Sequence, residues 1–193
     1  MKKFLICLLL SVCFASCNSE KKIHVSEVPI KTNVLGIELC KKVNYRQIDD
    51  ILYSATKKEF YIQEELISDN IIVYRCLPYN FSFYYGGQSW SYIDIRTINK
   101  QVYNITIYGS YTNINGAQKQ YDSILMPFEE KYGKSNFIEN DTTIRNAYWT
   151  DNINSISLAY YEGNSVNGNS RSFCELCYSN IELYNQVSNN RDI

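Results

Sequence analysis

The feature that most constrains the fold is a series of short segments in which polar and apolar side chains alternate. In residues 102–108, Asn104 and Thr106 fall on one face, and Ile105 and Ile107 fall on the other. Similar strand-like stretches span residues 60–66, 71–77, 81–85, 90–95, 143–150, 153–162 and 171–179. Turn-forming clusters separate several of them, at Ser68-Asp69-Asn70, Gly86-Gly87 and Asn99-Lys100. The sequence therefore predicts an antiparallel meander, and 18 tyrosines with only 3 prolines favour the same structure.

Two stretches instead have the apolar spacing of amphipathic helices. They span residues 43–58 and 117–131, and a further short helix is predicted over residues 180–187. Pro127 lies inside the second pattern, so we expect a kink or a break there, with Gly133 ending the helix.

The order of these elements predicts an α+β fold with two helix-plus-antiparallel-meander units and with the helices packed on one face of the sheet. Short sequence echoes support a repeat, since residues 48–52 are similar to 121–125, and residues 83–86 to 159–163. The predicted domain spans residues 33–187, with units at about 38–112 and 113–187.

The first residues have the layout of a secretory signal peptide. Lys2 and Lys3 precede an apolar run over residues 4–14, which is too short to span a bilayer. The junction Phe14-Ala15-Ser16-Cys17 resembles the lipobox of bacterial lipoproteins. That resemblance implies that residues 1–16 are removed, that Cys17 is lipidated, and that the chain is held to a membrane by its lipid anchor.

Residues 17–32 are polar apart from a few side chains and are predicted to form a flexible tether, while residues 188–193 form a C-terminal tail. Residue 18 is Asn and not Asp, so the inner-membrane retention signal of enteric bacteria is absent. We therefore expect a cell-envelope protein at the outer membrane; its periplasmic or surface orientation is left open.

The element order across residues 33–180 resembles two known folds. They are the beta-lactamase-inhibitory-protein-like fold (BLIP-like) and the small outer-membrane assembly lipoprotein fold (SmpA-like), both tandem helix-plus-meander layouts. The segment Glu130-Lys131-Tyr132-Gly133-Lys134, followed by a strand containing Trp149, is also similar to pieces of uncharacterised envelope lipoproteins. These resemblances imply a module that binds or assembles with another protein.

Charge and histidine content exclude several classes of function. Lys and Arg number 19 against 20 Asp and Glu, which argues against a nucleic-acid-binding protein. A single histidine, His24, argues against a multi-histidine metal site and a histidine-based catalytic triad. The sequence predicts no cofactor and no metal.

Four cysteines fall within the predicted domain: Cys40, Cys76, Cys174 and Cys177. Export would place them where disulfides form, so we expect two disulfides, or one disulfide and two buried thiols. The spacing of Cys174 and Cys177 also matches that of thiol-redox enzymes. On a strand, however, residues three apart point to opposite faces, which argues against a redox pair.

Tyrosine-rich strands carry the remaining candidates for a binding surface, namely Tyr84, Tyr85, Trp90 and Tyr92. The other interpretation of these aromatic residues is that they belong to the core. We predict a lipid-anchored, non-catalytic envelope protein that binds or assembles with another protein. The alternative is a glycan- or small-ligand-binding lipoprotein, and a thiol-redox enzyme is a third, weaker candidate.

Overall fold

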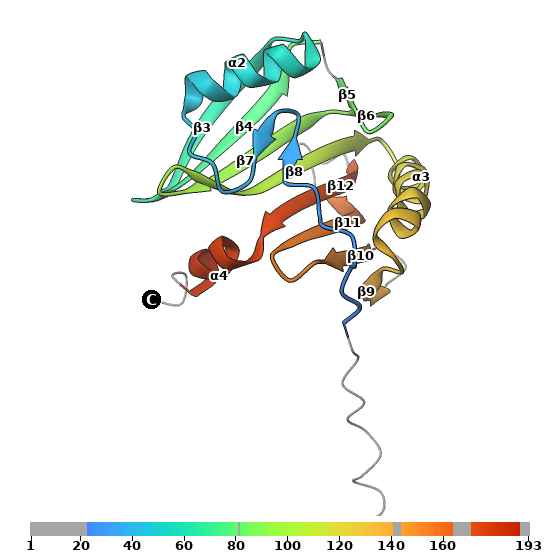
Figure 1. Cartoon of the computed structure of the whole chain (residues 1–193). Helices are drawn as coiled ribbons and strands as arrows, with labels where there is room; N and C mark the ends of the chain where they lie inside the picture. Colours follow the sequence, from blue (N-terminus) through green and yellow to red (C-terminus); the bar gives the residue numbers. More distant parts are fainter. Residues whose placement is uncertain (1–22, 81, 141–143, 164–170, 190–193) are drawn as a thin grey trace, which may run out of the picture.

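The centre of the molecule is a single eight-stranded antiparallel sheet (Figure 1). The computed structural model describes residues 23–80, 82–140, 144–163 and 171–189. In space the strands follow the order β3-β4-β7-β8-β12-β11-β10-β9. Their bounds are β3 Phe60–Ser68, β4 Ile71–Pro78, β7 Tyr92–Ile98, β8 Gln101–Tyr111, β9 Asn136–Asn140, β10 Ile144–Thr150, β11 Asn154–Gly163 and β12 Arg171–Asn180. The predicted α+β class is confirmed, and the alternating segments form strands of this sheet, except for the segment at 81–85, whose strand lies outside it.

Two small hairpins lie outside this sheet. One joins β1 (Asn33–Val34) to β2 (Ile37–Glu38), and the other joins β5 (Phe83–Tyr85) to β6 (Gln88–Trp90). The second hairpin turns through Gly86-Gly87, whose φ angles are 60° and 77°. Glycine adopts these positive φ angles without strain. The Gly-Gly signal therefore predicts the turn correctly, but this hairpin is an excursion between β4 and β7 and adds no strand to the main sheet.

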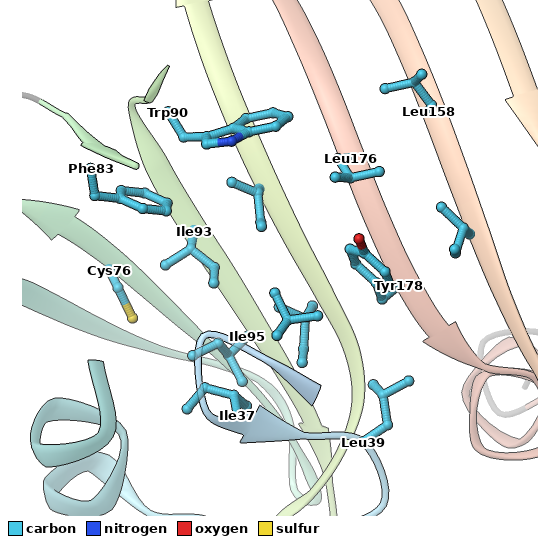
Figure 2. Close-up of a cluster of buried hydrophobic side chains, with 14 of the residues drawn as sticks. Ile37, Leu39, Cys76, Phe83, Trp90, Ile93, Ile95, Leu158, Leu176 and Tyr178 are labelled. Atoms are coloured by element: carbon cyan, nitrogen blue, oxygen red, sulfur yellow. The ribbon is translucent and has the colours of Figure 1, made fainter. Parts of the chain in front are cut away.

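Helices α2 (Tyr45–Thr56) and α3 (Ile114–Tyr132) cover one face of the sheet (Figure 1). Asn44 begins α2 with a capping box, in which its side chain accepts from the Gln47 amide and the Gln47 side chain accepts from the Asn44 amide. Apolar residues of both helices belong to the same core as the strands beneath them, including Ile48, Leu52, Tyr121 and Ile124. Figure 2 shows the sheet side of this core, with Cys76 on β4, Ile93 on β7 and Leu176 on β12. Trp90 joins them from β6 of the small hairpin.

The long helix α3 continues through Pro127. The expected break is therefore wrong: the helix extends to Tyr132. Packing explains this outcome, because Ile124 before the proline and Tyr132 after it are both buried in the same core. The helix ends where predicted, at Gly133, whose φ of 85° suits glycine.

The N-terminal segment is more ordered than a tether. The Ser26 amide donates to the Thr150 carbonyl over 2.7 Å, and Val25 forms a parallel bridge with Thr150. Ile30 is 3% exposed, and its amide donates to the Asp151 carboxylate over 2.7 Å. The tether predicted to reach residue 32 is therefore too long, because Ser26 and Ile30 are buried against the domain.

A third helix, α4 (Ile181–Asn189), lies on the opposite face of the sheet from α2 and α3 (Figure 1). Its Val187 packs in a separate cluster with Ile71, Ile98 and Tyr103. The Asn180 side chain accepts from the Leu183 amide and caps the helix. The predicted helix at residues 180–187 is confirmed, but placing every helix on one face is wrong, because Val187 provides α4 with its own apolar contact on the other side.

Gly109 lets α3 approach β8 closely, and its replacement should destabilise the fold. A Cβ at this position would collide with the Oε1 atom of Gln120. Gln120 is held in place, since it accepts from the Tyr111 hydroxyl over 2.7 Å and donates to the Ser89 carbonyl over 2.9 Å. We expect Gly109→Ala to lower the free energy of unfolding by about 1–3 kcal/mol in a urea titration.

The double variant Gly109→Ala/Gln120→Ala provides the control for this clash. It should lose less stability than the sum of the two single variants, by about 1 kcal/mol. Strictly additive losses would show that the close approach at Gly109 is not what limits packing.

Candidate binding site on the open sheet face

Among the described elements, α4 covers one end of the sheet face opposite α2 and α3, and we call this face the open face (Figure 1). Cross-strand partners place its side chains in rows, because directly opposite residues of an antiparallel pair share a face. The central rows are Tyr92-Tyr108-Glu175, Asp94-Thr106-Cys177 and Arg96-Asn104-Ser179. The open face is therefore mostly polar and aromatic, in contrast to the aliphatic core on the other side.

An ion pair with a buried carboxylate and a partly exposed guanidinium lies in the middle of the open face. Arg75 donates from Nε and Nη2 to the two carboxylate oxygens of Asp94, each over 2.9 Å. The Asp94 side chain is 1% exposed, whereas that of Arg75 is 45% exposed. The hydrogen bonds that Arg75 donates to Asp94 raise the pKa of the Arg75 guanidinium against the opposing effect of burial. The pair thus presents a fixed guanidinium to the exterior, 5.5 Å from the centre of the Tyr92 ring.

Four ring-bearing side chains form an aromatic patch beside this ion pair: Tyr92, Tyr108, Tyr161 and Phe173. Tyr92 and Tyr108 stack with ring centres 4.4 Å apart, and Tyr161 and Phe173 stack at 5.7 Å. Burial, followed by the charge of Asp94, raises the pKa of Tyr92 to about 12, so this hydroxyl stays protonated at neutral pH. Tyr108 is buried, and the other three residues are half-buried. Stacking keeps these rings rigid, which suits the half-buried ones to contact with another molecule.

Glu175 connects the aromatic patch to a cavity next to it. Its carboxylate accepts from the Tyr161 hydroxyl over 3.2 Å. Burial raises the pKa of Glu175, and this effect outweighs the Tyr161 hydrogen bond and the positive charge of Arg96, which both lower it.

The cavity, which we call the polar pocket, has a volume of about 450 Å³ and lies between the centre of the open face and α4. On its floor, Asn104 donates to Cys177 Sγ over 2.9 Å and to Ser179 Oγ over 2.8 Å. Thr106 donates to the Asn104 carbonyl oxygen over 2.8 Å, so these four side chains form one network. The pocket also includes Arg96.

The predicted tyrosine and tryptophan surface is not one surface. Trp90 is 1% exposed and donates from Nε1 to the Tyr85 carbonyl, so its assignment to a surface is wrong and it belongs to the core (Figure 2). Tyr85 borders a smaller cavity between the β5–β6 hairpin and α3. Tyr84 is 74% exposed on that hairpin. Tyr92 alone of the four lies on the open face.

The predicted disulfides are also wrong, because Cys40, Cys76, Cys174 and Cys177 are all free thiols. Cys76 is in β4, and the strands β7 and β8 separate it from β12, which places it about 14 Å from the cysteines there. That separation is twice the reach of a disulfide. Cys174 points into the core and Cys177 to the open face, as their spacing on a strand predicts.

None of these thiols has the environment of a redox enzyme. Burial is the largest cause raising the pKa of Cys76 and Cys174, and it also raises that of Cys177 despite hydrogen bonds from Thr106, Ser179 and Asn104. Burial and then the nearby carboxylates of Glu182 and Glu38 raise the pKa of Cys40. A thiol nucleophile needs the opposite shift.

Alkylation kinetics should reflect these environments. At pH 7 we expect exposed Cys40 to react with iodoacetamide more slowly than glutathione does, because its thiol is less ionised. Cys76 and Cys174, both fully buried, should react only after unfolding. Peptide mass spectrometry at successive times measures each site. A Cys174 or Cys177 that reacts faster than glutathione would restore the redox hypothesis.

The described residues contain neither a helix long and apolar enough to cross a membrane nor three His, Cys, Asp or Glu side chains grouped to hold a metal ion. No family model, curated protein or solved structure matches the chain.

Sequence reasoning missed the charged residues of the open face: Arg75, Asp94, Arg96 and Glu175. A signal was available, because Arg75, Asp94 and Glu175 are charged residues inside predicted strands, where charge is uncommon, and Arg96 directly follows the predicted strand at 90–95. What the sequence could not supply was the pairing of strands, which brings residues from β4, β7 and β12 together.

Proposed function

We propose that the chain is a lipid-anchored, non-catalytic protein of the cell envelope that binds another protein through the open face. The observation that carries this proposal is the aromatic patch beside Arg75, which none of the described helices covers. Tyrosine and arginine are enriched at the energetic centres of protein interfaces. In this protein the tyrosine and arginine side chains are already held in place before a partner binds, the rings by stacking and Arg75 by its ion pair with Asp94. Binding therefore costs less side-chain entropy, which supports the proposal.

The arrangement of elements supports a tandem origin for this face. Helix α2 is followed by strands β3, β4, β7 and β8, and α3 by β9, β10, β11 and β12. The strand order in the sheet reverses at the β8–β12 contact, so the two runs meet through their last strands. We propose that these are the two units expected at about 38–112 and 113–187, as in BLIP-like and SmpA-like folds. An experimental structure in which β3, β4, β7 and β8 fail to superpose on β9 to β12 would contradict this proposal.

Membrane attachment through Cys17 is the other half of the proposal. Cys17 lies outside the described residues, and the lipobox-like junction is its support. Because residues 25–30 pack on the domain, the segment between the lipid and the folded part is short. The domain would therefore stay close to the membrane surface, where an envelope partner would meet it.

A crosslinked pull-down tests the function. The tagged protein would be purified from detergent-solubilised membranes as wild type, as Tyr92→Ser and as Tyr84→Ser. Both variants remove a tyrosine ring, one from the aromatic patch and one from the exposed β5–β6 hairpin. We expect a stoichiometric partner whose recovery falls about tenfold or more with Tyr92→Ser and is unchanged with Tyr84→Ser.

Equal recovery with both variants would place the contact away from the open face. A Cys17→Ala sample adds a second readout, since a partner in the envelope should be lost when the anchor is lost. No partner from folded, membrane-bound protein would overturn the proposal and favour the small-ligand alternative.

A further inference from the structure

The polar pocket carries a feature that the protein-binding proposal does not use. Arg96 lines the pocket from β7, and its Nε atom is buried without a hydrogen-bond partner among the described residues. A buried guanidinium N–H without an acceptor costs free energy, so its retention calls for an acceptor that the protein itself does not supply.

The charges around Arg96 point to an anion as that acceptor. The nearby carboxylate of Asp94 already receives two hydrogen bonds from Arg75. The carboxyl group that lines the pocket itself, Glu175, accepts a hydrogen bond from the Tyr161 hydroxyl. Arg96 therefore supplies the available positive charge in this part of the open face, and a planar guanidinium fits a carboxylate through two parallel hydrogen bonds.

The rest of the lining suits a ligand with several hydroxyl groups. Ser155 on β11 offers a hydroxyl group that can donate and accept, and the oxygen atoms of Ser157 and of the Asn104–Thr106 network on the floor can accept hydrogen bonds. On the wall formed by α4, Tyr184 is 46% exposed and presents an aromatic ring to the pocket. Such a ring can cover the apolar face of a sugar ring while its hydroxyl remains solvated. The volume of about 450 Å³ lies within the range of about 300–1,000 Å³ of small-ligand sites.

We propose that the polar pocket binds a carboxylated sugar, with the carboxylate on Arg96 and the ring hydroxyls on the serine, threonine and asparagine side chains. The sugar is a uronic acid, either free or as a unit of a glycan. The pocket lies beside the aromatic patch, so this binding is separate from the contact with a partner protein and can be tested without that partner.

Saturation-transfer difference NMR on the full chain in detergent micelles tests the proposal, because it detects weak binding through the ligand's own signals. The probe is D-glucuronate, and the comparison ligands are D-glucose, which lacks the carboxylate, and acetate, which lacks the ring. We expect transfer to the ring protons of D-glucuronate and affinities about tenfold or more lower for both comparison ligands.

Two variants and a matched control locate the site. Arg96→Gln removes the guanidinium and should weaken D-glucuronate binding about tenfold or more. Arg46→Gln makes the same change at an exposed position of α2 and should leave binding unchanged. Ser155 is half-buried on the open face and lines the pocket, so Ser155→Trp fills the pocket without altering the core. This variant should abolish saturation transfer to D-glucuronate.

The outcomes separate cleanly. Absence of transfer to D-glucuronate with folded wild-type protein would overturn the proposal, as would binding that survives both Arg96→Gln and Ser155→Trp. If D-glucose bound as tightly as D-glucuronate, the proposed contact between the carboxylate and Arg96 would be contradicted. If acetate bound as tightly, the proposed contacts with the sugar ring would be contradicted. The pull-down described above does not depend on any of these results.

Discussion

Replacing Cys17 by alanine is expected to abolish lipid labelling of the protein. Wild-type cells fed radiolabelled palmitate should yield a labelled band, and the N-terminal peptide should begin at an acylated Cys17. The variant should carry no label and should migrate as a chain longer by residues 1–16, because cleavage follows lipidation in the lipoproteins that this junction resembles. Loss of the acyl chains should also release the protein from the membrane, because each buried CH₂ of an acyl chain contributes about 0.8 kcal/mol to membrane binding.

A matched control lies within the same leader. Cys13→Ala changes another cysteine of the predicted signal peptide and should leave both labelling and processing intact. Label that persists in Cys17→Ala, or that disappears in Cys13→Ala, would contradict lipidation at Cys17 and with it the proposed anchor.

Removal of Arg75 is expected to destabilise the fold strongly. Arg75→Leu would leave the Asp94 carboxylate, 1% exposed, without the two hydrogen bonds that it now receives. Breaking one side of a buried ion pair costs about 3–5 kcal/mol, and the partial exposure of Arg75 favours the lower end. Urea unfolding followed by circular dichroism should therefore show a loss of about 3 kcal/mol.

The double variant Arg75→Leu/Asp94→Leu distinguishes an unpaired charge from lost packing. Replacing both partners by apolar residues removes the buried carboxylate, so much of the lost stability should return. An equal loss in the single and double variants would mean that the ion pair contributes through the packing of the Arg75 side chain alone. Arg46→Leu on the exposed face of α2 should change stability little.

Much of the fold could be predicted because local signals and tertiary structure agree. Alternation over residues 102–108 falls inside β8, and the spacing of residues 43–58 and 117–131 gives α2 and α3. Strand β9 could not be predicted, because Asn136–Asn140 is short and has no alternation of polar and apolar residues. The break at Pro127 was a local rule overridden by the packing of Ile124 and Tyr132 on both sides of it.

The candidate site was harder to predict for a physical reason. A tyrosine or tryptophan in a strand fits a core as well as a surface, and Trp90 and Tyr92 differ by only two positions in the sequence. Trp90 is buried with the core beneath the β5–β6 hairpin, and Tyr92 lies on the open face. The two residues face different sides because β6 ends at Trp90 and β7 begins at Tyr92. No periodic pattern in the sequence indicates this change of strand at residue 91.

Site-specific photocrosslinking in living cells tests most directly whether the open face binds a partner protein. A photoreactive phenylalanine would be placed at Phe173 in the aromatic patch, and in a second strain at Lys119, which is exposed on α3. The proposal predicts a discrete crosslinked product from position 173 and none from position 119. Crosslinking from position 119 alone, or from neither position in folded, membrane-bound protein, would contradict it.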